Sequence, residues 1–183
     1  MKNTLKKFSL QSIYTRVFII LFVFSTFYVL PIILFNTWFN DDLGITLYGV
    51  TGLNGDGRPL GQLLSDFLSG GGIVADIGPL PLLCSMLILS YSLVLYAKEN
   101  IPFSEHHILL SFVLLTVLTN PLGMSILFYR TGGCVMITAL SIPFLLFSFN
   151  DEIATWIIGI VAFVSGIAIM SLYQAAFGMC LVL

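Results

Sequence analysis

The chain has 183 residues, of which 58% are hydrophobic and only 9% are charged, and its mean hydropathy is +1.04. Soluble domains carry about 25% charged residues, and a soluble globule of this length could not bury so much apolar surface, so lipid must be the solvent for much of the chain. The net charge of −2 argues against nucleic acid as a partner.

The first apolar run, residues 17–35, is predicted to be a retained membrane span. It is longer than the apolar region of a signal peptide, about 7–15 residues, and no small-x-small cleavage site follows it. Four of the seven Lys and Arg residues precede this run. The excess of positive charge predicts that residues 1–16 lie in the cytoplasm.

The first loop, residues 36–78, is the one long polar connection, and we expect it on the periplasmic side. A surface helix is predicted at about 58–69, because apolar residues recur there at helical spacing and Pro59 supplies a start. An amphipathic helix beside a span is expected to lie flat on the outer membrane surface. Its apolar positions are Leu60, Leu63, Leu64, Phe67 and Leu68, and its polar positions are Gln62, Ser65 and Asp66.

Four more apolar runs follow, and each must be helical because an open strand would leave its backbone groups unpaired in lipid. The fold class is therefore all-α: a single membrane domain, 1–183, forming a polytopic transmembrane bundle of about five spans. The last run continues to Leu183 and is too long for one untilted crossing, so we expect the chain to be the N-terminal part of a longer protein. The predicted spans are 17–35, 79–97, 108–128, 133–149 and 153–173.

Charged and small residues refine this arrangement. Lys98 and Glu99 are expected in a cytoplasmic loop, and Arg130 is expected on the outer side. Ala162 and Gly166 form a small-xxx-small pair, which predicts close helix packing. The three cysteines lie in apolar runs without CxxC spacing, so we interpret them as small hydrophobic residues and predict no metal site.

Five of the nine acidic residues lie in the outer loop: Asp41, Asp42, Asp56, Asp66 and Asp76. The tandem pair Asp41-Asp42 comes directly after the first span. Such a pair can act as a general base, bind a cation or simply be solvated. The neighbouring surface helix and the arginines on the same side favour a functional role.

Arg58 and Arg130 are the two cations expected on the outer side. An arginine fork suits phosphate recognition, and a carboxylate can take the proton of a sugar hydroxyl that attacks an anomeric carbon. The outer face therefore suits a phosphate-bearing lipid that carries a sugar.

The remaining candidates point less clearly to chemistry. His106 and His107 are adjacent, so on a helix they diverge by about 100° and cannot share a metal ion, and interface anchoring is the better interpretation. Tyr173 and Gln174 lie in an apolar run. A glutamine there is more often a helix–helix hydrogen-bonding residue than a ligand group.

Several segments in this order resemble the membrane glucosyltransferases that modify O-antigen in phage serotype conversion, a branch of the GT-C type glycosyltransferases. The segments are Asn40-Asp41-Asp42, Gly52 to Leu60, Asp76 to Leu80, Asn120-Pro121 through Tyr129-Arg130, and Ser171 to Ala175. They are spread over nearly the whole chain.

The resemblance implies a multi-pass protein of the bacterial inner membrane. It implies transfer of a sugar, commonly glucose, from a polyprenyl-phosphate donor to O-antigen or a related surface polysaccharide. Asp41 or Asp42 would be the catalytic acid residue of the first outer loop, and Arg58 and Arg130 would bind the donor phosphate. Asp56, Asp76, Tyr173 and Gln174 lie in the matched segments and are further candidates.

Two alternatives come from other classes. The chain departs from the family pattern at Ile45-Thr46 and at Thr131-Gly132-Gly133, where members carry an arginine and an aspartate. These departures would suit a non-catalytic or truncated multi-span protein. A transporter or channel subunit would place ionisable groups within its spans, and no charge falls in the five apolar runs.

Overall fold

The structure is a computed structural model that describes residues 2–35, 45, 47–49, 52–70, 79–101, 107–119, 132–149 and 154–180. Within these ranges the regular structure is helical and contains no strand. The elements are α1 (Lys2–Leu34), α3 (Pro59–Leu68), α4 (Leu80–Asn100), α5 (His107–Leu118), α7 (Gly132–Leu146), α8 (Thr155–Leu172), η1 (Gln174–Ala176) and α9 (Phe177–Cys180).

Three of these helices are long and apolar enough to cross a membrane: Ile13–Leu34 within α1, Leu80–Asn100 and Thr155–Leu172. Two shorter apolar helices, α5 and α7, complete the bundle. The all-α membrane fold predicted from hydropathy is thus confirmed. The part of the third predicted span beyond residue 119 lies outside the described residues.

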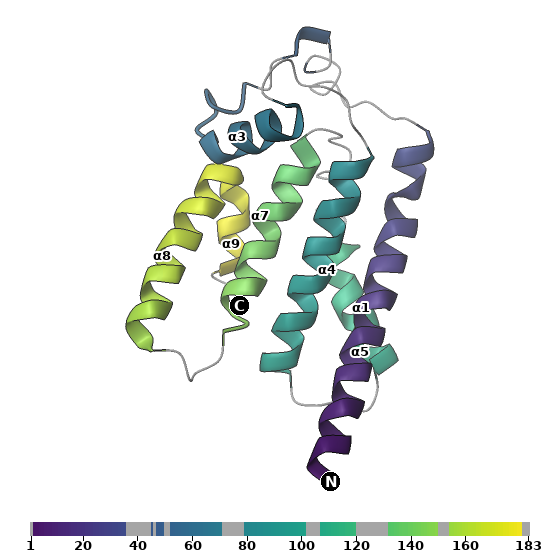
Figure 1. The fold of residues 1–183 in the computed structure, drawn as a ribbon. Helices are drawn as coiled ribbons and strands as arrows, with labels where there is room; N and C mark the ends of the chain where they lie inside the picture. Colours follow the sequence, from purple (N-terminus) through teal and green to yellow (C-terminus); the bar gives the residue numbers. More distant parts are fainter. Residues whose placement is uncertain are drawn as a thin grey trace.

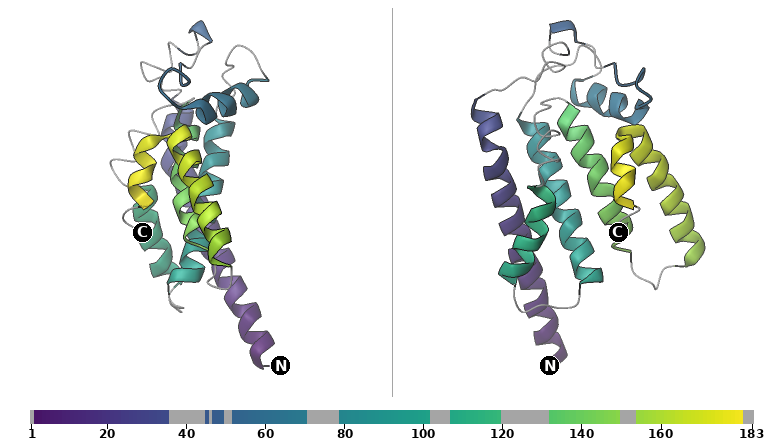
Figure 2. Two further views of the ribbon diagram at one scale, coloured as in Figure 1. Left: turned by 90° about the vertical axis from the view of Figure 1, so that its left-hand side faces the viewer. Right: turned by 180° about the vertical axis from the view of Figure 1, so that it is seen from behind.

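The long helices run side by side, and α3 lies across the end of the bundle opposite the N-terminus (Figure 1, Figure 2). Helix α4 packs on α7 and α1, while α1 also packs on α5 and α7 packs on α8. After α8 the chain turns, and α9 folds back against α7 and α8 (Figure 1).

Helices α4 and α7 form the most extensive helix pair and run in the same direction. Near their C-terminal ends the Asn100 side-chain amide donates a hydrogen bond of 2.7 Å to the Phe147 carbonyl. One turn earlier the rings of Tyr96 and Phe144 meet edge to face, with centroids 5.6 Å apart. Because the two C-terminal ends meet, the pair is parallel.

The prediction of a loop at Lys98 and Glu99 is wrong. Both residues lie in the last turn of α4, where their side chains form an ion pair of 3.2 Å. The helical hydrogen bonding continues to Ile101, whose amide donates to the Ala97 carbonyl. A lysine in the last turn is favourable because the C-terminal end of a helix carries partial negative charge.

Helix α8 lies at the edge of the bundle with most of its surface exposed. A Cβ atom added at Gly159 or Gly166 would meet nothing within 4 Å. The close packing predicted from the small residues is therefore absent among the described helices. Large apolar side chains such as Trp156 and Phe163 are exposed on this helix, as expected for a surface that faces lipid.

Helix α3 presents a different face to the protein from the one its pattern indicates. Ser65, expected among the polar positions, is only 4% exposed, whereas Leu63 and Phe67 are 64% and 78% exposed. The reason is Gly61, which is buried and whose Cβ position would lie 3.1 Å from Val135 of α7. The absence of a side chain at Gly61 lets this face approach α7. Leu63 and Phe67 are then turned outward, whereas Leu64 and Leu68 pack against α7 and α8.

Candidate active site

A tight turn places Arg58 at the start of α3. The Arg58 amide donates to the Leu53 carbonyl at 2.8 Å, and the Gly57 amide donates to the Asn54 carbonyl at 3.2 Å. Leu53 is buried and anchors the turn, and Gly57 has a φ of +74°. Pro59 then begins the helix with a φ that suits its first turn.

A break at the end of α8 supplies the other half of the site. The Tyr173 backbone is extended, with φ −159° and ψ 103°, and its amide still donates to the Ile169 carbonyl. The chain then forms the single turn η1, which starts at Gln174. The break directs the Tyr173 and Gln174 side chains to the turn that precedes α3, as their contacts with Arg58 show.

Arg58 is held by both of these residues. Its Nε donates a hydrogen bond of 3.2 Å to Oε1 of Gln174, a residue 116 positions away in sequence. Its guanidinium carbon lies 5.3 Å from the centre of the Tyr173 ring, a cation–π distance. The Arg58 guanidinium is therefore held at its Nε edge by Gln174 and on one face by Tyr173.

The Gln174 amide also binds the backbone of the turn. Its Nε2 lies 3.4 Å from the carbonyl oxygens of Asp56 and Gly57 and donates to them. One glutamine thus links the arginine side chain to the segment that carries it. Gln174 was expected to form a hydrogen bond between two helices. In the structure it instead links the end of α8 to the turn that precedes α3.

Arg58 has no carboxylate partner within 4.0 Å in the part of the chain that the structure describes. The ion pair found there, Lys98 with Glu99, is in the last turn of α4. Asp66 instead accepts a hydrogen bond of 2.8 Å from Gln62 on α3. No carboxylate of the described residues therefore neutralises the positive charge of Arg58.

Four of the predicted site residues are therefore brought together: Asp56, through its backbone carbonyl, and Arg58, Tyr173 and Gln174, through their side chains. The other four, Asp41, Asp42, Asp76 and Arg130, lie outside the described residues. Within the described ranges no group of three or more His, Cys, Asp or Glu side chains could hold a metal ion.

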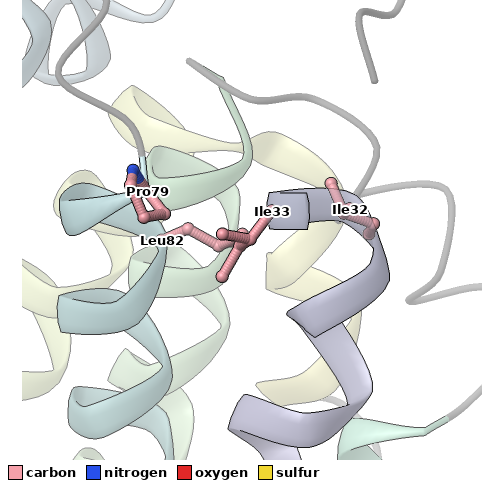
Figure 3. A pocket seen from close by; sticks show the side chains of 4 residues that line it. All are labelled: Ile32, Ile33, Pro79 and Leu82. Carbon is pink, nitrogen blue, oxygen red and sulfur yellow. The ribbon is translucent and has the colours of Figure 1, made fainter. Parts of the chain in front are cut away.

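A small crevice opens between the end of α1 and the start of α4 (Figure 3). It measures about 30 Å³ and is lined by Ile32, Ile33, Pro79 and Leu82. All four side chains are apolar, and the volume is about that of one water molecule. The described residues that line the crevice offer no group for chemistry, so the cluster around Arg58 is the candidate site.

The family model described as Glucosyl transferase GtrII matches residues 30–183. The chain belongs to the GtrII glucosyl transferase family. The match contains every predicted site residue and both halves of the Arg58 cluster.

One similar curated protein is a 55.3 kDa uncharacterized protein encoded in the gtrB 5′ region of Salmonella phage P22. It is 32% identical over 162 residues, which make up 88% of this chain and 33% of that protein. The chain thus spans about a third of the length of this relative. No solved structure matches the chain.

The family model carries the name of a glucosyl transferase. The apolar helices make the chain a membrane protein. The glucosyltransferase resemblance seen in the sequence segments is confirmed by the family match.

Proposed function

We propose that this chain takes part in transfer of a glucosyl group from a polyprenyl-phosphate donor to O-antigen or a related surface polysaccharide, by a GT-C type mechanism. The observation that carries the proposal is Arg58, held by Gln174 and Tyr173 with its charge unpaired among the described residues. It stands at the end of the bundle where α3 lies (Figure 1). An arginine at the surface of a membrane suits the phosphate of a lipid-linked sugar.

In the proposed reaction an acceptor hydroxyl attacks the anomeric carbon of the donor. Asp41 or Asp42 takes the hydroxyl proton, a new glycosidic bond forms, and the bond from the anomeric carbon to the phosphate oxygen breaks. Polyprenyl phosphate leaves with the bonding electrons. Arg58, with Arg130, stabilises the negative charge that grows on the leaving phosphate.

The site would face the periplasm in a bacterial inner membrane, with the N-terminus in the cytoplasm. Support for this orientation comes from the four basic residues before the first span and from the position of α3 at the opposite end of the bundle. The donor and the polysaccharide would then meet outside the cytoplasm.

The role of the aspartates is tested by glucosyl transfer in membranes that contain the protein, supplied with labelled polyprenyl-phosphate glucose and O-antigen. Asp41→Asn or Asp42→Asn is expected to lower the rate by about 100-fold or more, because general base catalysis contributes about that much. Asp66→Asn is the matched control, since Asp66 is occupied by Gln62 on α3. Full activity in both test variants would refute the assignment of the base.

The role of Arg58 is tested in the same assay by Arg58→Ala and Arg58→Lys. Loss of a hydrogen bond to a charged group costs about 1.5–3 kcal/mol, or about 10- to 100-fold in affinity. We expect the donor KM to rise by that factor in Arg58→Ala, with partial recovery in Arg58→Lys, which keeps the charge and loses the fork. An unchanged KM in both variants would exclude Arg58 from phosphate binding.

A second candidate is a non-catalytic or partial multi-span protein of the same family. The departures from the family pattern at Ile45-Thr46 and Thr131-Gly132-Gly133 favour it. Wild-type membranes that bind the lipid donor but transfer no sugar would support this candidate over the enzyme.

A further inference from the structure

We propose that Gln174 and Tyr173 are positioning residues that present only the terminal edge of the Arg58 guanidinium to a phosphodiester. This inference rests on the proposed function and specifies how the donor phosphate is held. It also accounts for the extended backbone of Tyr173 at the end of α8, which brings Tyr173 and Gln174 to Arg58.

A guanidinium has five N–H donors, one on Nε and two on each terminal nitrogen. In Arg58 the Nε donor is taken by Oε1 of Gln174 at 3.2 Å. The arrangement in which Nε and one terminal nitrogen bind an anion side-on is therefore blocked. The two terminal nitrogens have no hydrogen-bond partner among the described residues, and together they can form an end-on fork.

The orientation of the Gln174 amide is fixed by its other partners. Its Nε2 faces two carbonyl oxygens, those of Asp56 and Gly57, each at 3.4 Å. Turning the amide over would place its oxygen against these carbonyls and its NH₂ group against the Arg58 donor. Gln174 can therefore only accept from Arg58, and the side chain is held in one position.

Tyr173 fixes the plane of the guanidinium. Its ring lies 5.3 Å from the guanidinium carbon and covers one face. Because the N–H bonds of a guanidinium lie in its plane, an anion that accepts from the terminal nitrogens lies in that plane, at the terminal edge. A sugar-1-phosphodiester has two non-bridging oxygens, and an end-on fork matches that pair with two parallel charge-assisted hydrogen bonds.

A double-mutant cycle tests whether Gln174 acts through Arg58. The probe is a short-chain polyprenyl-phosphate glucose, which is the phosphodiester itself, and its Kd is measured on purified protein in lipid nanodiscs alongside the donor KM for transfer. We expect Gln174→Ala to raise the Kd about fivefold, the factor of one ordinary hydrogen bond, and to have no further effect in an Arg58→Ala background. Gln62→Ala is the matched control, since Gln62 bonds to Asp66.

A second measurement detects the contact between Gln174 and Arg58 without an activity assay. The chain has three arginines, Arg16, Arg58 and Arg130, so selective ¹⁵N-arginine labelling gives three Nε signals. The signal that Arg58→Lys removes should shift in Gln174→Ala and should stay in place in Gln62→Ala.

The outcomes separate the inference from the function on which it rests. The inference is overturned if Gln174→Ala weakens binding as much without Arg58 as with it, or if the Arg58 Nε signal does not respond. Either result would mean that Gln174 does not position Arg58. Lipid-phosphate binding by the wild type would still support the proposed function. If the wild type neither binds the probe nor transfers sugar, the proposed function fails, and the inference fails with it.

Discussion

Gly57 has a φ of +74°, in the left-handed region, and a Cβ added there would stand 3.6 Å from Nε2 of Gln174. The space is adequate, so the requirement for glycine at this position is conformational. The same backbone lets the Asp56 and Gly57 carbonyls point to Gln174. The geometry of the Arg58 cluster thus depends on one residue without a side chain.

We expect Gly57→Ala to lower stability by about 1–2 kcal/mol, the cost of a side chain in the left-handed region, and to raise the donor KM because the turn shifts away from Gln174. Thermal unfolding in nanodiscs and the transfer assay measure the two effects. Gly70→Ala is the matched control, since Gly70 has a φ of +73° and open space around it. Equal effects of both variants on KM would contradict a link between Gly57 and the site.

The sequence indicates the members of the Arg58 cluster but not their contact. Arg58 was predicted to bind phosphate because its residue type and its place beside a surface helix favour that role. Gln174 was predicted mainly as a helix–helix contact because it lies in an apolar run. Their hydrogen bond joins residues 116 positions apart and depends on where α8 ends, which hydropathy does not reveal.

At the scale of the helices, α3 shows how one glycine decides which face is buried. Its pattern predicts an apolar face made of leucines and Phe67, and the structure divides that face. Leu64 and Leu68 pack on the core of α7 and α8, while Leu63 and Phe67 are exposed. A helix face that carries a glycine can approach a neighbouring helix closely. In α3 this close approach outweighs the pattern of apolar and polar positions in the sequence.

We expect Gly61→Leu to displace α3 from α7, because even a Cβ at this position would lie 3.1 Å from Val135. The readout is maleimide labelling of Ser65→Cys in a background in which the three native cysteines are serine. Ser65 is 4% exposed, so labelling should be slow, and Gly61→Leu should accelerate it by about tenfold or more. Leu63→Ala, on the exposed face, should leave the labelling rate unchanged; equal rates in Gly61→Leu would contradict the packing.

At the scale of the whole molecule, three helices reach the length that a bilayer requires, and α5 and α7 are shorter within the described ranges. Their helical fold could be predicted, because backbone groups in lipid must be paired within their own segment. The pairing of α4 with α7 could not, since helices that are apolar on all sides carry little indication of which face meets which neighbour. The end of α4 was also misplaced, because a charged Lys98-Glu99 pair is compatible with a helix that emerges from the membrane as well as with a loop.

The predicted orientation is tested by cysteine labelling of intact cells in the same cysteine-free background. An impermeant maleimide should label Asn54→Cys, in the exposed turn before α3, from outside. It should label Glu99→Cys, in the last turn of α4, only after the membrane is permeabilised. The opposite pattern would place the Arg58 cluster in the cytoplasm and rule out a periplasmic reaction.

The parallel pair α4 and α7 has a consequence for biosynthesis. Asn100 and the Phe147 carbonyl that it contacts are 47 residues apart, and the chain must cross back to the α3 end before α7 can start. While the ribosome is still making the intervening residues, the surface of α4 that packs on α7 in the finished protein has no α7 beside it. Nascent α4 must therefore wait in the translocon or in lipid until α7 is made, and the α4–α7 pair can form only after that.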